Sequence, residues 1–402
     1  MANKTETSKK DPNGKLPKGW RLARFDEFAQ NIAQRVDPAE SDADVYVGLE
    51  HLDPDSLRIR RFGVPEDVIG QKLQFKTGDI IFGRRRAYQR KLGIAETNGI
   101  CSAHAMVVRA ITDQVDPNYL PFFLQSDMFM ERAIAISVGS LSPTINWRTL
   151  RTQQFPLPSA EDQKKISRLL LAAEEAIEES INSLEQLHLS RRVVVFQELS
   201  KFVALAESDD GVELCDVNDI CEQVTDGTHF TPTYVDEGIP FLRVTDIQDA
   251  SIDWSDVKRI PVQEHVELCK RCRPTRGDVL LSKNGTVGIT KVVDWDDEFS
   301  IFVSLCLLKP KSHVLPQYLA EVLRSGFAQK QFARRSKQGT VNNLHLVEIR
   351  GCKVPIPGLQ KQEQFVVACK SFDNALAAAV TRLESLKQLK GNLMASFLQR
   401  GV

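Results

Sequence analysis

Five cations surround a tyrosine in the segment "TGDIIFGRRRAYQRK", residues 77–91. The segment begins with a strand-like apolar run and then turns basic; its cationic side chains are Arg84, Arg85, Arg86, Arg90 and Lys91, around Tyr88. Guanidinium groups are planar, permanently charged donors that match anions bidentately. The cluster predicts either an anionic partner or a solvated strand end whose cations pair with nearby acids.

Charge is segregated along the chain. The whole sequence has a net charge of −1, which argues against a uniformly basic nucleic-acid binder. Residues 58–91, however, hold ten Lys and Arg against three acids, whereas residues 161–188 hold seven acids against three bases. Because the local sign of the charge selects partners, the basic and acidic segments are expected to contact different molecules.

The sequence repeats itself at an offset of 199 residues. The segment "RGDVLLSKNGTVGITK", residues 276–291, has the same Gly-Asp-apolar-apolar pattern as residues 78–81, and Tyr119-Leu120 matches Tyr318-Leu319. The motif "FPLP" at 155–158 matches "VPIP" at 354–357 at the same offset. The start of each copy, at 19–29 and 211–221, is offset by 192 residues instead. The chain is therefore a tandem duplication.

Each copy has two parts that differ in their pattern of apolar residues. The first part mixes short apolar runs with Gly and Pro breaks, which predicts short strands with some helix. The second part has apolar residues at steps of three and four, which predicts one long helix of about 35 residues. Ser159, followed by Asp162, fits the N-cap of the first of these helices.

These sequence patterns predict an α+β protein with two mixed α/β domains, each followed by a long helix. The expected boundaries are a flexible tail at 1–16, a first domain at 17–158, a helix and linker at 159–205, a second domain at 206–357 and a second helix at 358–402. The two helices are expected to pair as an antiparallel coiled coil with internal pseudo-two-fold symmetry. Alternatively, each helix lies on its own domain.

Catalytic motifs are absent from the sequence. It contains no glycine-rich phosphate loop, no His-Glu-x-x-His and no amino-methyltransferase motif of the Asn/Asp-Pro-Pro-aromatic type. Cys269 and Cys272 have metal-like spacing, but nothing in the spacing of Cys215, Cys221 or His265 selects further ligands. The acids in "VDWDDEF", 293–299, are interpreted as a solvated turn. We expect a non-catalytic chain, reduced thiols, no membrane span and a cytoplasmic location.

The order of these motifs resembles the specificity (S) subunit of type I restriction-modification systems. The matching stretches are "LPKGW" at 16–20, the two Gly-Asp strands with their loops, "FPLPSAEDQKKI" at 155–166, "DGTH" at 226–229 and "VPIPGLQKQEQ" at 354–364. The first copy has no counterpart of "DGTH", so no role for that loop is transferred to it. The family's glycine-bearing loop is better kept in "GTVNNLH" (339–345) than in "SPTINW" (142–147).

The resemblance implies a DNA-reading scaffold. Each target-recognition domain would read one half of a bipartite, asymmetric site in double-stranded DNA, while the helices set the spacing and dock two methyltransferase (M) subunits. Motor-nuclease (R) subunits would join the full complex. S-adenosylmethionine, ATP and magnesium are expected only in those partner subunits, with no cofactor and no metal in this chain.

The resemblance also suggests which side chains contact DNA. The expected set consists of the cationic segment, the loop after the second Gly-Asp strand, "DGTH" and the two later loops: Arg84, Arg85, Arg86, Tyr88, Arg90, Lys91, Asn146, Trp147, Thr228, His229, Lys283, Asn284, Thr286, Asn342 and Asn343. One or two of the five cations would read bases, since half or more of the hydrogen bonds between proteins and DNA go to phosphate and sugar. Tyr88 and Trp147 could equally be packing residues, and Trp20 and Trp254 are assigned to packing.

Two other function classes fit part of the pattern. A coiled-coil adaptor that binds only proteins would account for the acidic helix but not for the basic segment. A degenerate nuclease would need a set of metal-binding carboxylates, which the sequence does not supply. The recognised bases cannot be read from the sequence, because it carries no code for them.

Overall fold

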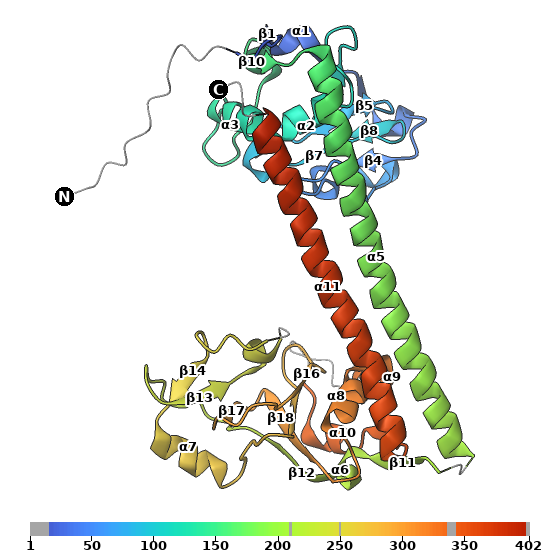
Figure 1. Ribbon diagram of the computed structural model, residues 1–402, viewed down its shortest axis with the longest axis vertical. Helices are drawn as coiled ribbons and strands as arrows, with labels where there is room; N and C mark the ends of the chain where they lie inside the picture. The colour runs from blue at the N-terminus through green and yellow to red at the C-terminus, as the bar shows by residue number, and fades with distance from the viewer. Residues whose placement is uncertain (1–15, 209–210, 249–250, 336–342, 399–402) are drawn as a thin grey trace, which may run out of the picture. The chain divides into compact units, whose positions relative to one another are not determined.

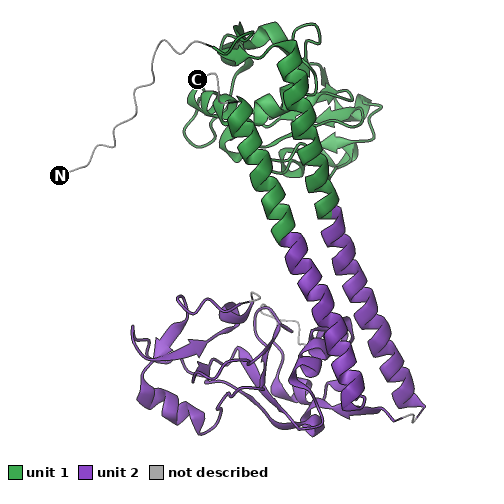
Figure 2. Cartoon of the chain, in the orientation of Figure 1, with its two compact units in different colours: residues 1–181, 381–402 green, residues 182–380 purple. Residues whose placement is uncertain are grey.

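The computed structural model describes residues 16–208, 211–248, 251–335 and 343–398, so the expected tail lies outside the described residues except for Leu16. The chain forms two compact units (Figure 2). Unit 1 comprises Met1–Ile181 with Thr381–Val402, and unit 2 comprises Asn182–Val380. The long helices α5 (Ala160–Glu207) and α11 (Leu359–Leu398) each begin in one unit and end in the other.

Unit 1 is built on short, mostly antiparallel strands (Figure 1). One sheet has the order β2-β9-β6-β7, a second has the order β3-β5-β8-β4, and β1 pairs with β10. The strands are β1 (Arg21–Arg24), β2 (Ala29–Ile32), β3 (Arg35–Val36), β4 (Tyr46–Val47), β5 (Lys72–Phe75), β6 (Ile80–Phe82), β7 (Leu92–Ile94), β8 (Gly99–Cys101), β9 (Met106–Ala110) and β10 (Gln154–Leu157). The short helices are α1 (Phe25–Phe28), α2 (Leu120–Gln125), α3 (Asp127–Ala135) and α4 (Trp147–Leu150).

Unit 2 repeats this plan. Its sheet β12-β18-β15-β16 has the strand order of β2-β9-β6-β7, and β11 pairs with β19 as β1 pairs with β10. The strands are β11 (Glu213–Asp216), β12 (Cys221–Asp226), β13 (Ile239–Leu242), β14 (Lys258–Ile260), β15 (Val279–Ser282), β16 (Thr290–Val292), β17 (Ser300–Ile301), β18 (Leu305–Pro310) and β19 (Lys353–Ile356). The helices are α6 (Val217–Ile220), α7 (Val262–Cys269), α8 (Pro316–Arg324), α9 (Gly326–Arg335) and α10 (Leu346–Arg350). The matching strand orders confirm that the two copies share a mixed α/β fold.

The repeated Gly-Asp motif forms a tight turn before the central strand of each unit. Gly78 and Gly277 have φ of 87° and 91°, a backbone conformation that favours glycine. The aspartates that follow are buried, and each accepts a backbone hydrogen bond across the turn: Asp79 from the Lys76 amide at 2.8 Å and Asp278 from the Thr275 amide at 2.7 Å. The motif therefore fixes how the strand starts.

In the first turn of each long helix, a buried glutamine ties three segments together. The Gln163 side chain accepts a hydrogen bond from the Asp116 amide at 2.8 Å and donates to the Pro158 carbonyl at 2.9 Å. Gln362 makes the equivalent bonds to the Leu315 amide at 2.9 Å and the Pro357 carbonyl at 2.8 Å. This arrangement explains why the Pro-apolar-Pro segment and the helix start recur together.

Ser159 caps α5 as the sequence predicts. Its hydroxyl accepts from the Asp162 amide at 3.2 Å and donates to the Asp162 carboxylate at 2.9 Å. The helices are longer than expected, with 48 residues in α5 and 40 in α11. The additional part of α5 carries Val195, Leu199 and Phe202, which continue the apolar spacing and are buried in the core of unit 2.

The core of each unit draws on both long helices. In unit 1, Ile166 and Leu170 of α5 and Leu398 of α11 pack with a phenylalanine cluster that includes Phe123 and Phe155, whose ring centroids lie 5.2 Å apart. In unit 2, the equivalent positions Phe365 and Cys369 of α11, together with Leu199 of α5, pack in the second core. The helices are therefore part of both hydrophobic cores.

An ion pair joins α5 to α11 within each unit. In unit 1 the Lys390 ammonium lies 2.6 Å from the Glu174 carboxylate, and both side chains are nearly buried. In unit 2 the Arg191 guanidinium lies 2.8 Å from Asp373 and 2.9 Å from Glu321. Glu174 and Asp373, like Arg191 and Lys390, are separated by the 199-residue offset of the repeat.

Replacing Lys390 with methionine is expected to lower the free energy of unfolding by about 3–5 kcal/mol, because Glu174 is left charged and buried without its partner. The double variant Lys390→Met with Glu174→Leu should recover most of that loss. Denaturant unfolding of the wild type and both variants measures this. Equal losses in the single and double variants would contradict the assignment of the pair.

Candidate nucleic-acid interface

The cationic loop, residues 84–91, leaves β6 in unit 1 and lies beside residues 142–147. The Ile145 amide donates to the Arg84 carbonyl at 2.9 Å, the Arg86 amide donates to the Pro143 carbonyl at 2.8 Å, and Arg85 forms an isolated antiparallel bridge with Thr144. Two segments that the sequence separates are thus brought together at the exit of one strand. Both belong to the set predicted to contact DNA.

The backbone of the cationic loop is unusual. Arg86 and Arg90 have φ of 56° and 52°, in the left-handed region that non-glycine residues rarely adopt. They flank a short 3-10 turn over Ala87–Gln89. Strain of this kind persists only where the surrounding structure imposes it, and it is concentrated at functional sites.

The exposed members of the loop are Arg86 and Tyr88, with Arg85 partly exposed. The Arg86 Nε donates to the Ser142 hydroxyl at 3.2 Å, which leaves the rest of its guanidinium available. Arg84 is more tightly held, because its Nη2 donates to the Ala103 carbonyl at 3.0 Å and its Nε is buried. Arg85, Arg86 and Tyr88 are therefore the side chains that this loop presents to solvent.

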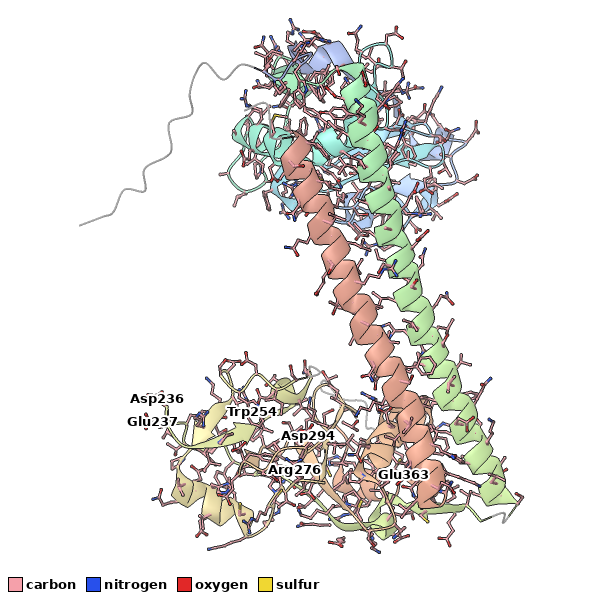
Figure 3. All side chains as sticks on the ribbon, in the orientation of Figure 1. Asp236, Glu237, Trp254, Arg276, Asp294 and Glu363 are labelled. Carbon is pink, nitrogen blue, oxygen red and sulfur yellow. The ribbon has the colours of Figure 1, made fainter. Side chains whose placement is uncertain are left out.

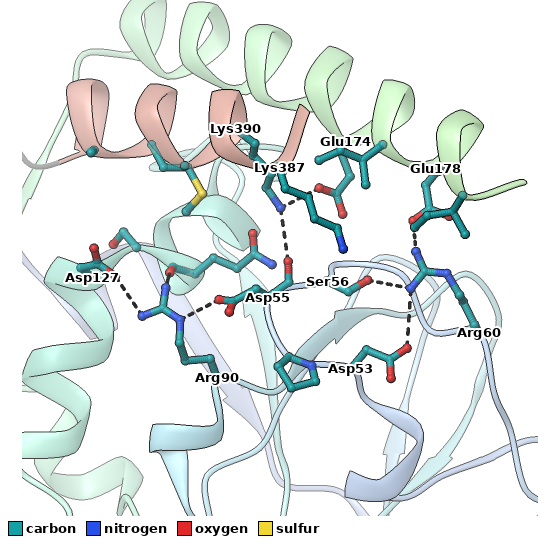
Figure 4. A pocket seen from close by; sticks show the side chains of 18 residues that line it. Asp53, Asp55, Ser56, Arg60, Arg90, Asp127, Glu174, Glu178, Lys387 and Lys390 are labelled. Atoms are coloured by element: carbon teal, nitrogen blue, oxygen red, sulfur yellow. Dashed lines mark hydrogen bonds and ion pairs between the residues drawn. The ribbon is translucent and has the colours of Figure 1, made fainter. Parts of the chain in front are cut away.

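Arg90 and Lys91 have other partners. Arg90 lies 2.6 Å from Asp55 and 2.9 Å from Asp127 and donates to the Gln125 carbonyl at 2.5 Å (Figure 4). The Lys91 ammonium donates to the Leu49 carbonyl at 2.9 Å. These bonds give both side chains a role in holding the domain together. Their contact with DNA stays a prediction that the geometry does not favour.

Arg90 lines a cavity of about 580 Å³ within unit 1. Its wall also includes Arg60, which pairs with Glu178 and Asp53, and the Lys390–Glu174 pair (Figure 4). Most of the charged groups around the cavity are thus paired with one another. The Arg60–Glu178 pair connects the domain to α5, and the Lys390–Glu174 pair joins α5 to α11.

Asn146 and Trp147 lie at the start of α4, directly after the segment that pairs with the cationic loop. Asn146 is exposed, which suits contact with an outside partner. The Trp147 ring is half-buried against Phe25, with ring centroids 5.6 Å apart, and belongs to the margin of the core. Of the two interpretations that the sequence allows for Trp147, packing is the one with a visible contact.

Unit 2 has an equivalent pair of segments at the exit of β15. The Leu344 amide donates to the Lys283 carbonyl at 2.8 Å, which repeats the bond between Ile145 and Arg84, and Asn284 forms an antiparallel bridge with Asn343. Thr286 is exposed in the loop and Asn284 is partly exposed. Asn342 lies outside the described residues.

Lys283 is buried rather than displayed. Its ammonium lies 3.3 Å from the Asp226 carboxylate, and 6% of the side chain is exposed. The sequence placed Lys283 among the DNA contacts because it follows the strand as Arg84 does. Its position instead gives it a supporting role beneath the loop.

The "DGTH" segment crosses the end of β17 and β18 at close range. A Cβ at Gly227 would lie 2.0 Å from the Ile301 carbonyl oxygen, so only glycine fits there. The Thr228 amide donates to the same carbonyl at 3.1 Å, and Thr228 is buried. His229 extends into solvent, with 62% of its side chain exposed, and its Nε2 lies 3.2 Å from Asp226. His229 is therefore the accessible residue of the motif.

Two residues near these loops were not predicted from the sequence. His104 of unit 1 lies with its Nε2 3.5 Å from Arg85 Nη1. Arg271 of unit 2 pairs with Asp226 and keeps 54% of its side chain exposed. His104 belongs to no motif, so no signal in the sequence would have selected it. Arg271 lies inside the Cys269-Lys-Arg-Cys272 segment, whose spacing suggests metal binding by the thiols and gives no sign of a role for the arginine.

The other suggested sites have local partners. Two acids of 293–299 pair with arginines: Arg276 lies 2.7 Å from Asp296 and Arg273 lies 3.3 Å from Glu298 (Figure 3, which labels Arg276 and Asp294). Trp254 packs on Trp295, with ring centroids 5.3 Å apart. Within the described residues, no group of three or more His, Cys, Asp and Glu side chains is placed to hold a metal.

Comparison with known proteins identifies the family of this chain. Residues 69–186 and 210–388 match the type I restriction modification DNA specificity domain. The chain belongs to this family. The two matched segments correspond to the two copies of the tandem duplication, and they contain both the cationic loop and its counterpart in unit 2.

Several relatives are specificity subunits. The chain is 25% identical over 213 residues to one assigned to the type I restriction enzyme MjaX of Methanocaldococcus jannaschii, a match that covers 51% of this chain and 50% of the relative. It is 23% identical to the EcoBI specificity subunit of Escherichia coli, over 63% of this chain and 60% of that subunit. The MjaVIII subunit of M. jannaschii is 18% identical over 97% of this chain and 95% of its own length. The first of these alignments thus spans only half of the relative.

Solved structures share the fold. A chain from work on complex assembly and conformational transition of the type I R-M system superposes with a TM-score of 0.62 at 21% identity, covering 96% of this chain and 98% of that one. A type I restriction-modification S subunit from M. genitalium gives a TM-score of 0.57 at 15% identity, with the same coverage. Separately, no helix of the described residues is long and apolar enough to cross a membrane.

Proposed function

We propose that this chain is the non-catalytic DNA-recognition subunit of a type I restriction-modification complex, with each unit reading one half of a bipartite site in double-stranded DNA. The observation that carries the proposal is the repeated site at the exit of β6 and β15. In each unit a loop leaves the central strand and pairs with a later loop, while the residues displayed there differ between the units. Equivalent scaffolds with different side chains suit the reading of two different sequences.

The electrostatics of unit 1 fit a nucleic-acid partner. Arg85 and Arg86 are displayed within a segment of net charge +7, formed by ten Lys and Arg against three acids at 58–91. Cations of this kind gain affinity for DNA by releasing condensed counterions, and some can pair with guanine in the major groove. An adaptor that binds only proteins would leave this segment without a role.

We further propose that α5 and α11 pair as an antiparallel coiled coil with a pseudo-two-fold axis. In such symmetry, residue i of one copy contacts residue j of the other, and j contacts i in return. The pairs Glu174–Lys390 and Arg191–Asp373 have this reciprocal form under the 199-residue offset. The division between the units, after Ile181 and after Val380, falls at equivalent positions of the two helices.

The partners follow from what the two copies share. The Pro-apolar-Pro segments and the helix starts are repeated, so they are proposed as docking sites for two methyltransferase subunits, with motor-nuclease subunits in the full complex. S-adenosylmethionine, ATP and magnesium would be bound by those partners. Mass measurement of the purified complex should give two methyltransferase subunits per chain, and a fully active one-to-one assembly would contradict this.

Binding of the full chain to a random-sequence duplex at increasing salt tests the proposal. If at least two cations contact phosphates, the affinity should fall by at least about tenfold between 50 and 200 mM salt, because each contact adds roughly 0.9 to the logarithmic slope. Absence of binding at low salt would favour the protein-binding adaptor instead.

DNA binding is also expected to depend on pH through His104. Partial loss of hydration and the charges of Arg85, Arg84 and Lys72 hold the pKa of His104 below its ordinary value of 6.5. A DNA phosphate beside Arg85 would offset that charge and raise the pKa, so the complex would bind a proton more readily than the free chain. The affinity for DNA should therefore rise as the pH falls from about 7.5 to 6. The gain is at most about tenfold for each pH unit by which bound DNA raises the pKa of His104.

Fluorescence anisotropy with a labelled duplex at constant ionic strength would measure this pH dependence. His104→Gln should flatten it while leaving the affinity at pH 8 nearly unchanged. His51→Gln is the control, because that imidazole accepts a hydrogen bond from the Gly48 amide and packs edge-on against Tyr46 within unit 1. An identical pH profile in His104→Gln and the wild type would exclude a role for His104.

A further inference from the structure

Asp226 connects an arginine, a lysine and a histidine in unit 2. It is the last residue of β12 and is buried. Its carboxylate pairs with the Arg271 guanidinium and lies 3.2 Å from His229 Nε2 and 3.3 Å from the Lys283 ammonium. Arg271 comes from the segment after α7, His229 from "DGTH" and Lys283 from the end of β15. One carboxylate thus joins three segments at the face where unit 2 displays its loops.

The three partners of Asp226 play different parts. Lys283 is buried beneath the carboxylate, whereas Arg271 and His229 extend from it into solvent, with 54% and 62% of their side chains exposed. Burial would raise the pKa of Asp226, but the hydrogen bond from His229 and the charge of Lys283 outweigh it and hold the pKa below its ordinary value. The carboxylate therefore stays charged at neutral pH and can orient both exposed groups.

Arg271 retains donors for an outside partner. Its guanidinium has five N–H groups in a fixed plane. Nη2 donates to Asp226 and Nη1 donates to the Gly227 carbonyl at 3.4 Å, so these contacts occupy two of the N–H groups and fix the plane. A guanidinium held by a carboxylate loses less entropy when it binds, because its orientation is already set.

A recess of about 360 Å³ lies directly beside this guanidinium. Arg271 and His229 line it together with apolar surface from Phe230, Leu268 and Ile301. Phe230 is 58% exposed, which is high for a phenylalanine without a partner surface. A paired cation, an exposed aromatic ring and an apolar recess are suited to the edge and methyl groups of DNA bases.

We propose that Arg271 reads a guanine in the half-site recognised by unit 2 and that Asp226 is the positioning residue that orients Arg271 and His229 for this contact. The inference rests on the proposed DNA-recognition function and names residues for it. It also explains how unit 2 reads DNA with fewer cations than unit 1. Arg271 supplies, from a segment 45 residues beyond Asp226, the guanidinium that the loop after β15 lacks.

The test selects preferred sequences from a pool of randomised duplexes with the full chain and then measures dissociation constants for the best duplex and its single-base variants. Arg271→Gln should lose the preference for guanine at one position and leave all other positions unchanged. Loss of one bidentate arginine–guanine contact corresponds to roughly 5- to 150-fold in discrimination. Arg273→Gln is the matched control, because Arg273 is also exposed, two residues away and also paired with an acid, Glu298.

The role of Asp226 needs a variant that still folds, since removing it alone would leave Lys283 buried and unpaired. The double variant Asp226→Asn with Lys283→Met removes both members of that pair. It should lose the same guanine preference as Arg271→Gln, and adding Arg271→Gln should cause little further loss. A purely structural role would weaken binding to every duplex equally without changing the preference.

The outcomes separate the inference from the function on which it rests. If the wild-type chain enriches no sequence and binds no duplex, the proposed function fails. If the wild type selects a bipartite site and Arg271→Gln selects the same site with the same discrimination, the inference alone is overturned.

Discussion

Replacing Arg85 and Arg86 together with glutamate is expected to reduce the affinity of the chain for duplex DNA on the order of 100-fold at moderate salt, because two phosphate contacts are lost and two repulsive charges are added. The slope of log affinity against log salt should fall by about two. Both side chains extend from the cationic loop, so the melting temperature should stay nearly constant. Arg84 is left unchanged because its guanidinium bonds to the Ala103 carbonyl inside the domain.

The control for this experiment carries the same change of charge elsewhere. Lys164→Glu with Arg168→Glu alters two exposed cations on α5, outside the loops, and should change DNA affinity only slightly. Filter binding or anisotropy over a salt series compares the two double variants. Equal losses in both would mean that the chain responds to net charge rather than to contacts by the cationic loop.

Lengthening both long helices is expected to lengthen the spacer between the two half-sites by one or two base pairs. An insertion of four residues at 180–182 in α5 needs a matching insertion at 379–381 in α11, because the core of each unit contains a part of both helices. Four residues add about 6 Å and rotate the helix by about 40° beyond a full turn, close to the rise and twist of one or two base pairs of B-DNA.

Methylome sequencing of a strain that carries the double insertion gives the readout. The bases of both half-sites should stay the same, since no residue of the displayed loops has changed. An insertion in α5 alone is the control, because it shifts one helix against the other and should instead lower the melting temperature. Altered half-site bases with an unaltered spacer would show that the helices do not set the distance.

Much of the fold could be predicted because its signals are local or periodic. The 199-residue offset revealed the duplication, and the steps of three and four revealed the long helices. The spacing of Ser159 and Asp162 located the first cap. The cap and the helical periodicity depend on residues that are close in the sequence. The duplication needs only a comparison of the sequence with itself.

The candidate site was only partly predictable. The sequence predicted that the loops after β6 and β15 are equivalent. It could not distinguish the cations that face solvent from those that are paired inside the domain. Arg90 follows the same strand as Arg86, yet it pairs with Asp55, 35 residues away. Lys283 has the position of Arg84 in the repeat, yet it is buried and its ammonium pairs with the Asp226 carboxylate of β12.

The sequence by itself determined the repeat, the alternation of mixed domains with long helices and the segregation of positive charge into residues 58–91. Only the tertiary structure decided which cations face solvent and which are held inside, and it alone placed His104 beside Arg85 and Arg271 beside Asp226. The physical reason is that an ion pair depends on a few ångströms of separation. Sheet pairing brings together residues that are tens of positions apart, and composition and spacing carry no record of that distance.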